Sequence, residues 1–93
     1  MLYDQKKLDN AIAMYQKAIE LDPKYAGAYY NWGNVLYEQK KYDDAIAKYQ
    51  KVVELDPKNA IAYNNWGVVL RELNRYDEAK IKFDKARELD PAQ

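Results

Sequence analysis

The side chains of this chain whose types and spacing could support catalysis are two pairs of neighbouring acids, Asp43–Asp44 and Asp77–Glu78. Paired carboxylates can act as general acid and base, or bind calcium. The two pairs, however, lie 34 residues apart, each at the predicted start of a helix. Acids at a helix start interact favourably with the unpaired amides and with the helix dipole. We therefore interpret them as helix-start signals rather than as a catalytic or metal site.

Composition restricts the remaining chemistry. The 93 residues include no Cys and no His, which excludes disulfides, thiolate nucleophiles, imidazole bases and the usual zinc or copper ligands. No nucleophile is paired with a base in a recognisable motif, and no phosphate-binding loop occurs. We predict that the chain is not an enzyme and uses no cofactor or metal.

The charge balance argues against nucleic-acid and membrane partners. Fifteen basic residues balance fifteen acidic residues, so no net field attracts the chain to a polyanion. No apolar run approaches the roughly 18 to 20 residues of a membrane span, and the first residues lack the apolar segment of a secretory signal. We expect a cytoplasmic protein that binds neither nucleic acid nor membrane.

Aromatic residues are abundant, with ten Tyr and two Trp, and could form a stacking platform for bases. Most of them recur at apolar positions of the predicted helices, so we assign these to the core: Trp32, Trp66, Tyr15, Tyr29, Tyr42, Tyr49, Tyr63 and Tyr76. Tyr30, Tyr37 and Tyr25 are then the aromatic residues expected to be free to meet a ligand.

The elements that must position these residues follow from an internal repeat. The dipeptide Asp-Pro occurs at Asp22–Pro23, Asp56–Pro57 and Asp90–Pro91, with a constant period of 34 residues. Such a period is typical of an array in which each unit is a small helical element that buries its apolar face on its neighbours. We divide the single domain into a partial unit, 1–25, and two full units, 26–59 and 60–93.

Each full unit shows helical spacing twice. Steps of three and four residues connect two sets of apolar residues in the second unit: Tyr29, Trp32, Val35 and Leu36, then Ala45, Tyr49, Val52 and Val53. This pattern predicts a hairpin of two helices per unit and an all-α fold. We expect the second helix of each unit to start at Asp9, Asp43 or Asp77, and a proline to open the helix that follows.

These residues resemble the tetratricopeptide repeat over essentially the whole chain. The second unit carries the family pattern as Tyr29, Trp32, Gly33, Leu36, Tyr42, Ala45, Tyr49, Val52 and Pro57. The third unit carries it as Tyr63, Trp66, Gly67, Leu70, Tyr76, Ala79, Phe83, Ala86 and Pro91. The family usually has Trp where this chain has Tyr29 and Tyr63, and Leu where it has Trp32 and Trp66. The resemblance implies a right-handed superhelical stack of antiparallel helical hairpins, an α-solenoid.

The resemblance also implies a binding function. In this family the first helices of successive units line a concave groove that holds a peptide or a partner helix. The chain is therefore expected to be a protein-interaction scaffold. The groove positions we assign to peptide binding are Tyr30, Asn31, Asn34, Tyr37, Asn64, Asn65, Val68 and Arg71.

Asparagine is prominent in this groove and offers both a donor and an acceptor to a peptide backbone. Asn31 and Asn65 are one period apart and resemble the asparagine ladder of some long family members. Asparagine is also common at these positions in generic repeat sequences, and that explanation carries more weight than a ladder. The carboxylate clamp of family members that bind chaperone tails is incomplete, because Asn34 and Asn65 match two of its residues but Tyr30 replaces a Lys.

The turn between the two helices of each unit departs from the family. Gly is common there, whereas this chain has Lys6, Lys40 and Asn74. A lysine gives up roughly 1 kcal/mol in the left-handed conformation that stops a helix, while Asn tolerates it. A hairpin could therefore open into one long helix and exchange its halves with a second chain as a domain-swapped dimer.

The ends of the array suggest a second route to self-association. Met1 aligns with Val35, so the first unit keeps only its second helix, and no polar capping helix follows the third unit. Both ends are expected to expose apolar surface and to stack on other copies. We expect an excised or engineered piece of a longer array, with self-assembly, by stacking or swapping, as the alternative to a groove-binding function.

Overall fold

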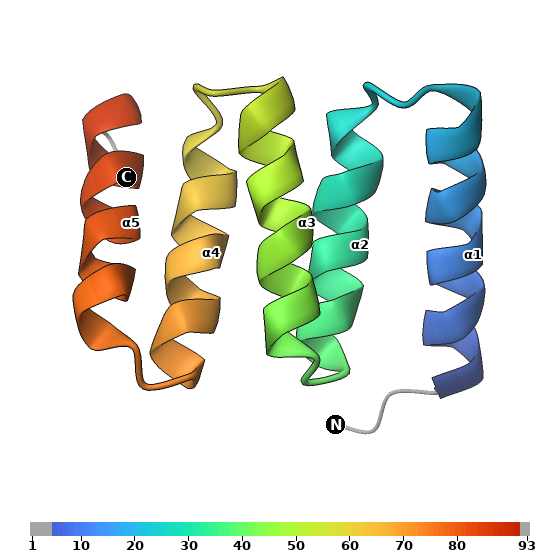
Figure 1. Ribbon diagram of the computed structural model, residues 1–93, viewed down its shortest axis with the longest axis horizontal. Helices are drawn as coiled ribbons and strands as arrows, with labels where there is room; N and C mark the ends of the chain where they lie inside the picture. The colour runs from blue at the N-terminus through green and yellow to red at the C-terminus, as the bar shows by residue number, and fades with distance from the viewer. Residues whose placement is uncertain (1–4, 92–93) are drawn as a thin grey trace.

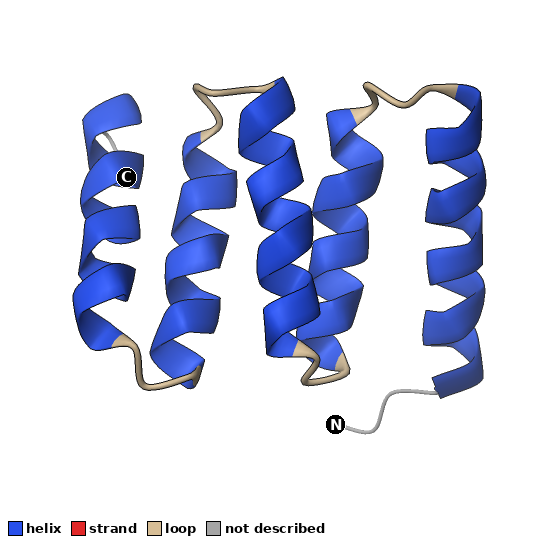
Figure 2. Cartoon of the chain, in the orientation of Figure 1, coloured by secondary structure: helices blue, strands red, loops and turns tan. Residues whose placement is uncertain are grey.

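The computed structural model describes residues 5–91. Within this range the chain forms five helices: α1 (Gln5–Leu21), α2 (Ala26–Glu38), α3 (Tyr42–Leu55), α4 (Ala60–Glu72) and α5 (Tyr76–Leu89). The helices lie side by side in chain order, each antiparallel to the next (Figure 1). No strand is present among the described residues, as Figure 2 shows. The predicted all-α stack of hairpins is confirmed, while the residues at the ends of the predicted units, 1–4 and 92–93, lie outside the described range.

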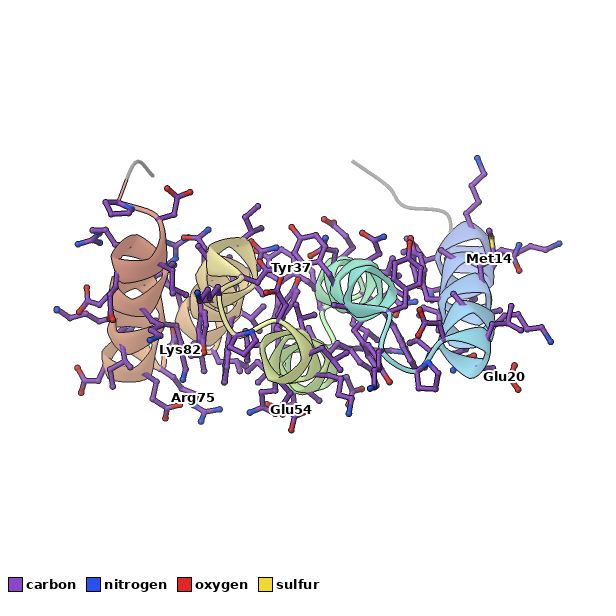
Figure 3. The ribbon with its side chains drawn as sticks, turned by 90° about the horizontal axis from the view of Figure 1, so that it is seen from above. Met14, Glu20, Tyr37, Glu54, Arg75 and Lys82 are labelled. Carbon is purple, nitrogen blue, oxygen red and sulfur yellow. The ribbon has the colours of Figure 1, made fainter. Side chains whose placement is uncertain are left out.

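Successive helices pack against each other, α1 on α2, α2 on α3, α3 on α4 and α4 on α5. Seen from above, α3 is displaced to one side of α2 and α4 (Figure 3). The core therefore lies where α3 faces both first-type helices, α2 and α4. It is formed by buried residues from α2, α3, α4 and α5: Leu36, Ala45, Ile46, Tyr49, Val69, Leu70 and Ala79.

Small residues set how closely the paired helices approach. Gly33 and Gly67 are buried in α2 and α4. A methyl group added to Gly33 would lie 2.8 Å from Cε1 of Tyr49, and one added to Gly67 would lie 2.7 Å from Cε1 of Phe83. An aromatic ring of the second helix of each hairpin thus lies against the bare backbone of the first helix.

The hairpin turns adopt the left-handed conformation expected at Lys40 and Asn74, each with φ 63°. At the end of α2, the amide of Lys41 donates to the carbonyl of Leu36 at 2.8 Å and that of Lys40 donates to the carbonyl of Tyr37 at 2.9 Å. These are the paired bonds of a Schellman motif, which satisfies carbonyls at a helix end. The third predicted turn residue, Lys6, instead lies inside α1, so that prediction is wrong.

The predicted helix starts need correction. α3 and α5 begin one residue earlier than expected, at Tyr42 and Tyr76, and their acidic pairs lie in the first turn without capping bonds from the flanking side chain. These acids interact favourably with the helix dipole, and Glu78 also pairs with Arg75 at 2.8 Å. Asp9 lies within α1 rather than at its start. The prolines precede α2 and α4 within the linkers instead of opening these helices, and Asn59 caps α4 by accepting from the amide of Ala62 at 3.0 Å.

Aromatic burial is more uneven than predicted. Tyr49 is fully buried at 1 % exposure, whereas Tyr76 is 61 % exposed and donates to Asn74 Oδ1 at 2.8 Å. Trp32 and Trp66 are half-buried, and each is covered by a lysine ammonium at 3.8 and 3.9 Å from the ring centre. Cation–π contact with the half-buried side chains of Lys48 and Lys82 thus covers the indole faces that the helices leave accessible.

Replacing Gly33 by Ala is expected to destabilise the fold by about 1–3 kcal/mol, although Ala favours helices, because the new methyl meets the immobile ring of Tyr49. Gly27→Ala is the matched control, since its methyl meets the ring of Tyr25, which is 49 % exposed and free to rotate away. Urea unfolding followed by circular dichroism measures both. Equal stability of the two variants would contradict the close approach of α2 and α3.

Candidate functional site

A cleft of about 260 Å³ opens between α2 and α4, above α3. It is lined by Asn34, Tyr37, Glu38, Tyr49, Asn65, Val68 and Val69. Figure 3 places Tyr37 between the two first-type helices, on the opposite side of α3 from Glu54. We call the channel between α2 and α4 the groove.

A hydrogen-bond network fixes the wall of the groove. The hydroxyl of Tyr49 donates to Asn34 Oδ1 at 2.5 Å, and Asn65 Nδ2 donates to the same oxygen at 3.2 Å and to the hydroxyl of Tyr30 at 3.0 Å. The network joins α2, α3 and α4. The rings of Tyr30 and Tyr49 also pack together, with their centres 6.2 Å apart. Because three helices share it, the side chains are held in place before any ligand arrives.

The same network leaves groups available for a ligand. Asn34 Nδ2 and Asn65 Oδ1 form no hydrogen bond with residues 5–91, and neither is a buried unpaired atom. One donor and one acceptor therefore face accessible space on neighbouring helices. Asn31 is exposed on α2 but does not line the cleft.

The groove differs in character at its two ends. Beside the N-terminal ends of α2 and α4, a second hollow of about 240 Å³ is lined by Ala26, Gly27, Tyr30, Asn59 and Ile61. Ile61 is 53 % exposed there, so this end offers apolar surface. At the other end, Glu38 lines the cleft and the hydroxyl of Tyr37 donates to Glu72 Oε1 over a long 3.5 Å.

Burial and these acids perturb the tyrosines of the groove. The pKa of Tyr37 is raised above its ordinary value, first by burial and then by the nearby carboxylate of Glu72. The pKa of Tyr49 is raised further, first by burial and then by neighbouring Tyr30, with Glu38 adding to the shift. Both hydroxyls stay protonated at neutral pH and act as hydrogen-bond donors.

Most of the predicted site residues lie together. Tyr30, Asn34, Tyr37, Asn65 and Val68 line one or other part of the groove, and Asn31 lies exposed on α2.

Two other predicted site residues point elsewhere. Asn64 lines a separate hollow with Phe83, Ala86 and Arg87. The guanidinium of Arg71 lies 5.6 Å from the ring centre of Phe83. Both side chains therefore face α5 rather than α2. They lie on the side of α4 that packs against the next helix of the array.

Sequence reasoning missed Tyr49 and Val69 as groove residues. Both repeat at core positions, and a core assignment is correct for most of their atoms, since each is 1 % exposed. The Tyr49 hydroxyl nevertheless reaches Asn34 in the cleft wall. The available signal was the difference between Tyr49 and its equivalent one period later, Phe83. A buried Tyr needs a hydrogen-bond partner, whereas Phe does not.

The described part of the chain contains no group of three or more His, Cys, Asp or Glu residues placed to hold a metal ion. None of the helices described here has the length and apolar character needed to cross a membrane.

The fold and the groove define an α-solenoid built of helical hairpins, a class of protein-interaction scaffolds. The family model described as TPR repeat matches residues 1–40 and 33–73, and the model described as Tetratricopeptide repeat matches residues 60–93. The chain belongs to the tetratricopeptide repeat family. No curated protein sequence matches it significantly.

Solved structures agree with this assignment. A crystal structure of MamA is 34 % identical, with a TM-score of 0.89, over 91 % of this chain and 50 % of that chain. The first TPR of Spaghetti (RPAP3), bound to the HSP90 peptide SRMEEVD, is 28 % identical, with a TM-score of 0.89, over 96 % of this chain and 71 % of that chain. The present chain thus spans about half the length of the MamA chain it matches.

Replacing Tyr49 by Phe is expected to cost about 1 kcal/mol at pH 8, because the hydrogen bond to Asn34 is lost. The raised pKa of Tyr49 favours the protonated phenol in the folded state. The stability that Tyr49 contributes is therefore complete at pH values below 10.0, the ordinary pKa of tyrosine, and declines as the pH rises above that value.

Urea unfolding of wild type and Tyr49→Phe at pH 8 and pH 11 checks both effects. The stability difference between the two proteins should shrink at the higher pH, and a difference that grows would contradict the environment of Tyr49.

Proposed function

We propose that this chain is an interaction module that holds an extended peptide in the groove between α2 and α4. The observation that carries the proposal is the amide pair in the groove wall. Asn34 Oδ1 accepts and Asn65 Nδ2 donates within the network, whereas Asn34 Nδ2 and Asn65 Oδ1 are available to a ligand. A peptide backbone needs a donor and an acceptor in alternation, and a fixed amide pair supplies both.

An extended ligand fits this arrangement better than a helix. The backbone groups of a bound helix are already paired within the helix, so the groove amides would gain nothing from them. An extended peptide exposes those groups along its length and gains enthalpy from each amide it meets. Recognition through backbone groups also tolerates varied side chains, which suits a scaffold.

The Spaghetti structure supports a peptide ligand in this fold but not the same peptide. The HSP90 peptide bound there ends in Glu-Glu-Val-Asp. The present groove has Tyr30 where the carboxylate clamp of the family uses Lys, and Glu38 lines its cleft. A carboxylate-rich tail would meet no compensating cation there, and desolvating it without one is costly.

Asn31→Ala is expected to weaken peptide binding several-fold without changing stability, because Asn31 offers an exposed amide on α2 and forms no hydrogen bond with another described residue. Asn65→Ala is expected to weaken binding more, since it also loosens the wall. Isothermal titration against peptides selected from a capped peptide array measures the affinities. Gln50→Ala, an exposed change on α3 outside the groove, is the control. Unchanged affinity in both groove variants would assign the binding to another surface.

Self-association by hairpin opening is a second candidate function, and a specific observation favours it. The tripeptide Gln-Lys-Lys occurs twice, at 5–7 and at 39–41. The first copy is helical within α1, whereas the second forms the turn between α2 and α3. The same residues therefore fit a continuous helix, and the turn carries a strained lysine at Lys40 with φ 63°. Joining α2 and α3 would relieve that strain and preserve the packing between chains.

End-to-end contact is a different route to the same outcome. α1 contains no buried residue, and its Met14 and Leu21 are 71 % and 78 % exposed. Ile81 on α5 is 62 % exposed. Stacking of copies through these faces would remove apolar surface from water.

Lys40→Gly is expected to lower the dimer fraction at high micromolar concentration. Glycine relaxes the left-handed turn by about 1 kcal/mol and disfavours a continuous helix by a similar amount. Asn74→Gly is the matched control, because Asn74 has the same φ of 63° in the α4–α5 turn and already tolerates it. Light scattering coupled to size exclusion gives the mass. A wild-type monomer would reject swapping, and a dimer removed by Met14→Glu but not by Lys40→Gly would indicate stacking.

A further inference from the structure

Two glutamates lie at the same end of the groove. Glu38 and Glu72 are one period apart, each the last residue of its helix. Glu38 lines the cleft, and Glu72 accepts from the hydroxyl of Tyr37, whose ring lines the same cleft. Both carboxylates also lie at helix C-terminal ends, where the dipole adds partial negative charge. This end of the groove therefore presents two carboxylates to a ligand.

Neither carboxylate forms an ion pair within residues 5–91, and Lys40 and Lys41, which follow Glu38 in the turn, do not bond to it. The ion pairs within residues 5–91 join other residues, all on the second-type helices or at the turn before α5: Lys17–Glu20, Lys51–Glu54, Arg75–Glu78, Lys80–Asp84, Lys85–Glu88 and Arg87–Asp84. Arg71, the neighbour of Glu72, points to Phe83 on α5 instead. A surface that is acidic, concave and unpaired attracts a ligand of opposite charge.

We infer that the groove selects an extended peptide carrying an arginine or lysine whose cation lies between Glu38 and Glu72. The inference rests on the proposed peptide-binding function. The aliphatic stem of such a side chain would cover Val68 and the ring of Tyr37, which line the cleft. Arginine suits the position best, because its planar group donates to a carboxylate in two places and stacks on aromatic rings.

The other end of the groove adds an apolar requirement. The hollow beside Tyr30 and Ile61 exposes apolar surface at the N-terminal ends of α2 and α4. From Tyr30 to Glu38 the helix rises by about 12 Å at roughly 1.5 Å per residue. An extended peptide covers that length in three to four residues. The preferred ligand therefore has an apolar side chain three or four positions away from its basic side chain.

The proposed groove prefers a ligand of opposite charge to the acidic ligand of a carboxylate clamp. The peptide of the Spaghetti complex, SRMEEVD, contains three acidic side chains. In the present groove they would face Glu38 and Glu72, and like charges in a partly desolvated cleft repel. The groove is thus built to reject acidic tails while it accepts basic segments.

An array of capped nonapeptides tests the inference. Each peptide contains leucine and a variable residue three or four positions away, with alanine and serine elsewhere, and the variable residue is arginine, lysine, glutamine or glutamate. Fluorescence anisotropy gives the affinity for wild type, for the Glu38→Gln/Glu72→Gln variant and for Glu54→Gln. Glu54 is an exposed acid on the far side of α3 from Tyr37, so its variant controls for the loss of charge (Figure 3).

Arginine peptides are expected to bind wild type about tenfold more tightly than glutamine peptides, and glutamate peptides more weakly still. The double variant should remove this preference, and Glu54→Gln should keep it. Higher salt should reduce the preference as well.

Three outcomes would overturn the inference, and they separate it from the proposed function. Equal affinity for arginine and glutamine peptides, weakened by Asn31→Ala, would leave the groove as a binding site and reject its charge selectivity. An arginine preference that survives in the double variant would assign the cation to another site. Absence of binding by every peptide would reject both the selectivity and the proposed function.

Discussion

The contact on which this structure depends is the ring of Tyr49 lying against the bare backbone of Gly33. It lets α2 and α3 approach closely, and it places a large side chain of 1 % exposure at the centre of the core. The same ring ends in a hydroxyl that reaches Asn34 in the groove wall. One side chain therefore carries out two tasks, since its carbon atoms fill the core and its oxygen orients the candidate binding residues. Packing and recognition are coupled through it.

The repeat does not make its units equivalent in environment. Asn31 and Asn65 occupy the same place in the period, yet Asn31 is exposed while Asn65 donates to Tyr30 and Asn34. Lys6 and Lys40 share the tripeptide Gln-Lys-Lys, yet one is helical and the other is left-handed. The difference lies in what packs alongside, because each unit is completed only by its neighbours. Function in such an array belongs to the junctions between units rather than to any single unit.

The groove gains a direction from these junctions. Its ends differ, with Ile61 exposed near the N-terminal ends of the first-type helices and Glu38 and Glu72 near their C-terminal ends. A fixed amide pair lies between them. Under the proposed function, affinity would come from backbone pairing that any extended peptide can make, and selectivity would come from the two ends. The same tetratricopeptide fold would then serve ligands of opposite charge, since the fold sets only where the ligand lies.

The sequence alone determined the all-α hairpin array, the period, the close-packed glycines and the left-handed turns at Lys40 and Asn74. Each of these follows from spacing or from the conformational limits of single residues, which are local properties. The tertiary structure alone decided the network of Tyr49, Asn34 and Asn65, and the direction of Asn64 and Arg71 toward α5. It also decided that Gln5–Lys7 is helical. These features depend on which helix packs alongside, and spacing within one helix does not specify the neighbour.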